Sequence, residues 1–190
     1  MAAGKAVDSK ATLSILGVVQ GVGFRPFVAR LAKEHGLTGQ VCNEGGQVRV
    51  TAYGDVPALR AFAEAIEKSA PRASRIVSLD VLVEPLRVDE LIPTTFFIAQ
   101  SEAAEGLAMP TPDIATCDDC LRELFTQNDP RHRNPFISCT HCGPRFTILR
   151  QLPYDRRHTA MDAFPLCEHC DAQYRNHADR RHHEIGRAHV

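Results

Sequence analysis

The chain has 190 residues, a formal net charge of −1 at pH 7, 44% hydrophobic residues and seven cysteines. This balance gives no general attraction to nucleic acid or to an anionic membrane, and no apolar run approaches the roughly 20 residues that span a bilayer. Because the charged N-terminus has no apolar stretch behind it, we expect no signal peptide and a cytoplasmic, reducing location. In that setting clustered cysteines indicate metal binding rather than disulfides.

The two halves of the chain differ in composition. Up to residue 101 the chain has one histidine and one cysteine, whereas from residue 109 onward it has six cysteines, eight histidines and no lysine. Between the halves, Gly106, Pro110 and Pro112 are typical of a linker. The predicted organisation is a flexible N-terminus at 1–10, a first domain at 11–101, a linker at 102–112 and a second domain at 113–183.

The first domain shows strand and helix periodicities in turn. Gly45-Gly46 is a hairpin signal between two of the strands, and Cys42 is expected to be a small buried hydrophobe. The order βαββαβ, with one more edge strand, predicts an α+β, ferredoxin-like sandwich in which both helices cover one sheet face. The predicted elements are a strand at 12–19, a helix at 24–32, strands at 39–43 and 47–53, a helix at 57–66, and strands at 77–83 and 95–99.

The second domain is poor in periodic structure. Its sequence predicts a single helix at 117–126, where Leu121, Leu124 and Phe125 share a face. So few core-forming residues should not hold one conformation unaided, so we expect a small, irregular domain stabilised by zinc.

A glycine-rich turn joins the first strand to the first helix at residues 17–25. Gly21 and Gly23 let backbone N–H groups turn inward, and the helix N-terminus adds the positive end of its dipole. Arg25 adds a guanidinium suited to phosphoryl oxygens. Such a segment is more often only a tight turn, and such an arginine more often a solvated surface residue, so the residues alone leave both readings open.

Two segments resemble the signatures of acylphosphatases. Residues 17–26 read Gly-Val-Val-Gln-Gly-Val-Gly-Phe-Arg-Pro, and residues 39–48 resemble the second signature. The family has the ferredoxin-like fold, and the resemblance implies that Arg25 binds the phosphoryl group while Asn43 orients the attacking water. Positioning and charge stabilisation then carry an in-line displacement without a covalent intermediate. The implied phosphate-binding loop consists of Gln20, Gly21, Val22, Gly23, Phe24 and Arg25.

Four cysteines of the second domain have the spacing of a zinc site. Cys117 and Cys120 form one Cys-x2-Cys clip, and Cys139 and Cys142 form another after an eighteen-residue spacer. Four thiolates close a tetrahedron around a structural Zn²⁺, whereas a catalytic site keeps a position open to water. The alternative, pairing the second clip with a third at 167–170, leaves the first clip without partners.

The third clip, Cys167 and Cys170, needs two further ligands. A repeat of the spacer would put the next cysteine at position 189, which is a histidine, and the following one beyond the last residue. Residues 184–190 look like a translated sequencing adapter, so we expect a non-native tail and an incomplete second zinc site. Histidines are candidates by type, although each one singly is more typical of solvated surface: His177, His182, His183 and His189.

The two halves together resemble the N-terminal part of the hydrogenase-maturation carbamoyltransferase family, HypF. Three segments carry this resemblance: 111–117, 134–148 and 152–156. It implies a C-terminally truncated piece whose first domain, an acylphosphatase-type hydrolase, acts on carbamoyl phosphate or another acyl phosphate. Later domains, absent here, would activate carbamate with ATP and pass the carbamoyl group to the C-terminal cysteine of a maturation partner.

Two other function classes compete with this interpretation. The chain could be a catalytically silent zinc-binding scaffold or interaction module, or a zinc protein that binds nucleic acid. The last is the weaker alternative, because eleven arginines from residue 110 onward are matched by eleven acidic residues and stacking aromatics are few.

Overall fold

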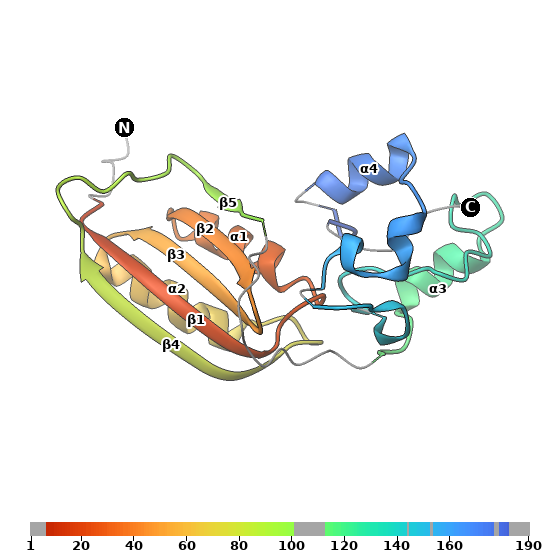
Figure 1. The fold of residues 1–190 in the computed structure, drawn as a ribbon, viewed down its shortest axis with the longest axis horizontal. Coiled ribbons are helices and arrows are strands. Elements are labelled where there is room, and N and C mark those ends of the chain that lie inside the picture. The colour runs from red at the N-terminus through yellow and green to blue at the C-terminus, as the bar shows by residue number, and fades with distance from the viewer. Residues whose placement is uncertain (1–6, 101–112, 144, 153, 177–178, 183–190) are drawn as a thin grey trace.

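The computed structural model describes residues 7–100, 113–143, 145–152, 154–176 and 179–182. A sheet backed by helices lies beside an irregular region with two short helices (Figure 1). The predicted linker and tail, and the first six residues, lie outside the described residues. Among the described helices, none combines the length and apolar character needed to cross a membrane.

The first region has the predicted α+β order. Its elements are β1 (Ser9–Val18), α1 (Phe24–Glu34), β2 (Thr38–Glu44), β3 (Gln47–Gly54), α2 (Val56–Lys68), β4 (Arg75–Pro85) and β5 (Phe96–Ile98). The sheet order is β4-β1-β3-β2-β5, with β5 parallel to β2 and the other pairs antiparallel. β1 starts at Ser9, inside the stretch predicted to be a flexible terminus, because Ser9 and Lys10 pair with the end of β3.

One apolar core holds this region together. Both helices lie behind the same face of the sheet (Figure 1), and their buried sides meet alternate residues of the strands, such as Leu13, Ile15 and Val50. Asp55 caps α2 by accepting a hydrogen bond from the backbone N–H of Ala58 at 2.6 Å. Cys42 is buried on β2, as predicted.

The second region contains two short helices rather than the single one predicted. α3 (Asp118–Phe125) is the expected helix, but α4 (Glu168–Arg175) forms as well. The prediction missed α4 because its residues are nearly all polar and form no clear apolar stripe. Each helix begins directly after the first cysteine of a clip and carries acidic residues in its first turn, where they favour the positive end of the helix dipole.

The second region is also an internal repeat that the sequence analysis did not find. Arg131 and Arg181 stand fifty positions apart, and the N–H of each donates to an aspartate two residues earlier at 2.8 Å. Each arginine then reaches the helix of the other repeat. Arg131 donates through Nη2 to Gln173 on α4, while Arg181 donates through Nη2 to Glu123 on α3. The two repeats therefore exchange arginines and support each other.

Candidate active site and metal centre

The glycine-rich segment forms a sharp turn between β1 and α1. Gly21 and Gly23 both have φ of 72°, a left-handed conformation that side chains with a Cβ rarely adopt. Gly23 is also the N-cap of α1, so the turn leads directly into the helix N-terminus. A Cβ at Gly23 would lie 2.8 Å from the Thr140 side chain, so this position admits no other residue without movement.

Arg25, in the first turn of α1, is buried rather than solvated. Only 8% of the residue is exposed, and its Nη2 lies 3.1 Å from Oδ1 of Asp155 in the second region. A buried guanidinium needs such a partner, because an unpaired charge away from water is costly. The arginine that the sequence assigns to phosphate thus contacts a carboxylate 130 positions later in the chain.

Gln20, at the start of the turn, joins three parts of the molecule. Its Nε2 donates to the carbonyl of Gly45 at 3.0 Å, and its Oε1 accepts a hydrogen bond from the N–H of Tyr154 at 3.2 Å. The first contact fixes the loop beside the β2–β3 turn, two residues after Asn43. The second ties the loop to the cysteine-rich region.

Asn43 is fully buried near the end of β2. Within the described part of the chain, neither Oδ1 nor Nδ2 of its amide has a hydrogen-bond partner. Buried polar groups without partners are rare, and each one calls for an explanation such as a water or a ligand. An amide in this position can orient a water molecule.

A small cavity lies against the loop where the two regions meet. Its volume is about 20 Å³, and its lining includes Gly21, Arg25, Thr140, Tyr154 and His182. This is room for about one water molecule. The cavity wall therefore comes from both regions.

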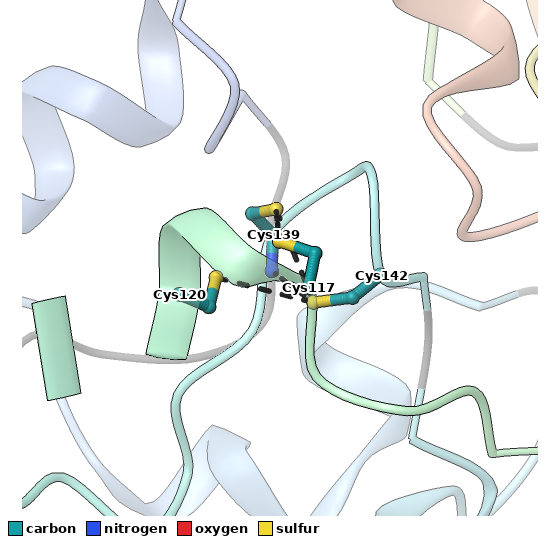
Figure 2. Close-up of side chains that lie close together, drawn as sticks. All are labelled: Cys117, Cys120, Cys139 and Cys142. Carbon is teal, nitrogen blue, oxygen red and sulfur yellow. Dashed lines mark hydrogen bonds between the residues drawn. The ribbon is translucent and has the colours of Figure 1, made fainter. Parts of the chain in front are cut away.

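The four cysteines of the first two clips converge at the N-terminus of α3 (Figure 2). Their sulfur atoms all lie within 4.8 Å of one another, with Cys117–Cys139 at 3.7 Å, Cys139–Cys142 at 3.9 Å and Cys142–Cys120 at 4.0 Å. Zn–S bonds of about 2.3 Å in a tetrahedron set sulfur–sulfur distances of about 3.8 Å. The arrangement thus fits Zn²⁺, and all-thiolate donors favour this soft site over hard cations.

Arginines surround the sulfur cluster. Nη1 of Arg180 lies 3.3 Å from Sγ of Cys120, and Nη2 of Arg145 lies 3.5 Å from Sγ of Cys142. Arg181 approaches Sγ of Cys120 at 3.7 Å. Four thiolates around Zn²⁺ carry a net charge of about −2, which these guanidinium groups offset.

Charge also acts between the thiols and their neighbours. Hydrogen bonding from Cys120, then from Cys139, lowers the pKa of Cys142, while contact with Cys120 and Cys142 raises the pKa of Cys139. Burial alone would raise the pKa of Glu123, but hydrogen bonds and charge from Arg180 and Arg181 outweigh it and lower that pKa. One thiolate and one carboxylate are thus already favoured beside the arginines.

The third clip remains a pair among the described residues. Sγ of Cys167 lies 3.4 Å from Sγ of Cys170, but the described residues hold no cluster of three or more metal-ligating groups apart from the four cysteines of the first two clips. His177, His183 and His189 lie outside the described residues. His182 is buried, with Nδ1 at 2.9 Å from the carbonyl of Tyr174.

Sequence reasoning missed the residues that connect the two regions. Tyr154 and Asp155 stand within segment 152–156, which entered only as part of a family resemblance and received no role. No periodicity or spacing pairs them with Gln20 or Arg25, because the contacts join positions more than a hundred residues apart.

Comparisons with known proteins separate the two regions in the same way. The acylphosphatase family profile matches residues 11–98, and the profile described as the HypF finger matches residues 116–149. The chain is 44% identical over 66 residues to an acylphosphatase of Photorhabdus laumondii, of which it covers 72%. This second comparison involves 34% of the chain.

Longer matches cover both regions at once. The chain is 45% identical over 172 residues to the carbamoyltransferase HypF of Rhodobacter capsulatus, which is 90% of this chain and 22% of that protein. A crystal structure of full-length HypF in a phosphate- and nucleotide-bound form matches with a TM-score of 0.82 and 40% identity, over 95% of this chain and 24% of that one. The chain thus spans about a fifth of the HypF relatives that it matches. It belongs to the acylphosphatase family through residues 11–98 and, with the HypF finger behind that domain, is homologous to the N-terminal region of HypF carbamoyltransferases.

Proposed function

We propose that the first domain hydrolyses an acyl phosphate, with the loop at residues 20–25 holding the phosphoryl group. The observation that carries this proposal is the guanidinium of Arg25, buried at the N-terminus of α1 behind two left-handed glycines. A phosphoryl dianion satisfies such a cation and accepts hydrogen bonds from the first N–H groups of the helix.

Asn43 is the residue that orients water in this proposal. Its buried amide has both a donor and an acceptor to offer, and Gln20 holds the loop beside the turn that follows β2. The water oxygen forms a bond to phosphorus while the bond from phosphorus to the acyl oxygen breaks, and the acyl group leaves as a carboxylate. Arg25 and the loop stabilise the charge on the phosphoryl oxygens during this displacement.

Carbamoyl phosphate is the substrate that the homology favours. The long relatives are named carbamoyltransferases, and one was solved with phosphate and nucleotide bound. We infer that the first domain releases phosphate and leaves carbamate. Activation of carbamate with ATP, and transfer of the carbamoyl group to the C-terminal cysteine of a hydrogenase-maturation partner, belong to parts of the relatives that this chain does not match.

Zinc has a structural role in the proposal. Cys117, Cys120, Cys139 and Cys142 would hold the ion with all four positions filled by sulfur, which leaves no position for a reacting water. The ion would fix the cysteine-rich region, and the region in turn holds Tyr154 and Asp155 against the loop.

The test is phosphate release from carbamoyl phosphate and acetyl phosphate. Arg25→Ala should lower kcat/KM by roughly a hundredfold or more, and Asn43→Ala should lower kcat by a similar factor. Arg30→Ala is the matched control, because Arg30 lies on the same helix but is exposed and pairs only with Glu34 in the next turn. Undiminished turnover by Arg25→Ala would contradict the hydrolase proposal.

A catalytically silent zinc scaffold is the second candidate. It is favoured by the contact of Arg25 with Asp155 and by a cavity that holds only about one water molecule. In that case the protein would bind zinc fully and release no phosphate above the uncatalysed rate, in the wild type and in Arg25→Ala alike.

A further inference from the structure

The cysteine-rich region reaches into the phosphate loop at three points. Asp155 contacts Arg25 at 3.1 Å, the N–H of Tyr154 donates to Gln20 at 3.2 Å, and Thr140 lies against Gly23. Gln20, Gly23 and Arg25 are all members of the proposed phosphate-binding loop. The second region therefore forms part of that site.

The space beside the loop is too small for a phosphoryl group as the regions stand. The inner cavity of about 20 Å³ takes one water, while a wider groove of about 330 Å³ lies outside it. Arg25 lines both spaces, and Asp155 lines the outer one together with Arg156 and Arg157. The ion pair of Arg25 with Asp155 thus stands where the outer groove meets the loop.

Asp155 and a phosphoryl dianion would compete for the same cation. The side chains of Arg25 and Asp155 are 9% and 15% exposed, so water screens little of the repulsion between a carboxylate and a phosphoryl group at this point. A guanidinium also binds a dianion more strongly than a carboxylate, because more charge and more acceptor atoms face its fork of donors.

We propose that Asp155 is a specificity-determining residue of the phosphate loop, an internal anion that an incoming phosphoryl group must displace from Arg25. This inference rests on the proposed function. A dianion gains enough to displace the carboxylate, whereas a monoanion such as acetate exchanges one single charge for another and gains nothing. The loop therefore selects phosphoryl dianions, and the return of Asp155 to Arg25 promotes release of the product phosphate.

The experiment measures binding of inorganic phosphate and of acetate to the whole chain with zinc bound. Asp155→Asn and Asp155→Ala should each bind phosphate roughly tenfold more tightly, the factor that corresponds to about 1.4 kcal/mol of lost competition. Acetate affinity should rise by more than phosphate affinity, so the preference for the dianion falls. Asp162→Asn is the control: its carboxylate lines the same outer groove, and it should leave both affinities unchanged. Unchanged or weaker phosphate binding by the Asp155 variants would overturn the inference.

Arg25→Ala separates this inference from the proposed function. If that variant loses phosphate binding and turnover while Asp155→Asn behaves as the wild type, only the role of Asp155 fails. If Arg25→Ala binds phosphate normally, the loop is not the site and the proposed function fails.

A measurement on the wild type removes the dependence on folding of the variants. Saturating inorganic phosphate should speed amide hydrogen exchange at residues 154–158, because displacement of Asp155 loosens that segment from the loop. Unchanged or slower exchange there would count against displacement.

Discussion

The two regions of this chain are held together by different means. The sheet region buries twenty apolar residues in one continuous cluster, from Ala11 on β1 to Ile66 on α2. In the described part of the cysteine-rich region, the buried clusters are much smaller: one consists of Ile137 with three cysteines, and another of Tyr154 with Met161. Apolar burial can carry the first region, whereas the second depends on sulfur, metal and arginine contacts.

This difference explains where the proposed chemistry lies. A rigid sheet and two packed helices fix the backbone of the loop, so Gly21, Gly23 and Arg25 keep their positions without metal. The second region supplies Tyr154 and Asp155, whose positions depend on a fold that zinc holds. Perturbing one region at a time therefore tests the division.

Removal of zinc should have the largest effect. Cys139→Ser or a strong chelator should unfold the second region and leave the sheet region folded, since a structural zinc site contributes about 10 kcal/mol or more to folding. Hydrogen exchange should speed up at residues 113–182 and stay slow in the core strands, with one zinc fewer per chain. Cys42→Ala is the control, because Cys42 is buried on β2 and should leave the zinc content unchanged. A single cooperative loss of both regions would break the comparison.

A core truncation should give the converse result. Phe62 is fully buried on α2, with its ring against His35 and Phe96 at centroid distances of 6.1 and 6.4 Å. Phe62→Ala should destabilise the sheet region by about 3–5 kcal/mol in urea unfolding, because it loses apolar burial and leaves a cavity. Zinc content in native buffer should stay at the wild-type value, and a loss of zinc there would show that the regions fold as one unit.

The exchange of arginines between the repeats predicts a smaller effect on the metal. Arg181 contacts Sγ of Cys120, Glu123 and the carbonyl of Ser138, so Arg181→Gln should weaken zinc binding roughly tenfold to a hundredfold. Competition with a chromophoric chelator measures this affinity. Arg175→Gln is the matched control, since Arg175 is exposed on α4 and pairs with Asp171 in the same helix. Equal affinities of the two variants would contradict a role for Arg181 at the metal.

Much of this architecture could be predicted from the sequence, for local reasons. Strand alternation, Gly36 after α1 and the glycine turn before Gln47 act within a few residues, so the elements of the sheet region follow from them. The cysteine cluster follows from spacing alone. The contact of Arg25 with Asp155 could not be predicted, because it depends on how the two regions pack rather than on any periodic pattern. The helix α4 failed for a related reason, since tertiary contacts rather than an apolar stripe hold it.

The smallest expected effect is a pH-dependent contribution inside the sheet region. Lys10 on β1 donates to Glu90 at 2.6 Å, which fastens the segment after β4 to the edge of the sheet. The hydrogen bond to Glu90 raises the pKa of Lys10 above 10.5, and the one from Lys10 lowers the pKa of Glu90 below 4.5. Glu90 therefore stabilises the fold fully above pH 4.5, and this contribution is lost as the pH falls through its folded pKa. The share of Lys10 is lost as the pH rises through the raised pKa.

Glu90→Gln isolates this ion pair, because the amide oxygen can still accept from the hydroxyl of Tyr53. Its Tm for the sheet region should lie slightly below that of the wild type between pH 4.5 and 10.5, and the two values should converge in acid and in strong base. Glu64→Gln removes a fully exposed pair with Lys68 on α2 and should change Tm less at neutral pH. A constant difference between Glu90→Gln and the wild type across the whole pH range would assign the effect to packing of the side chain rather than to its charge.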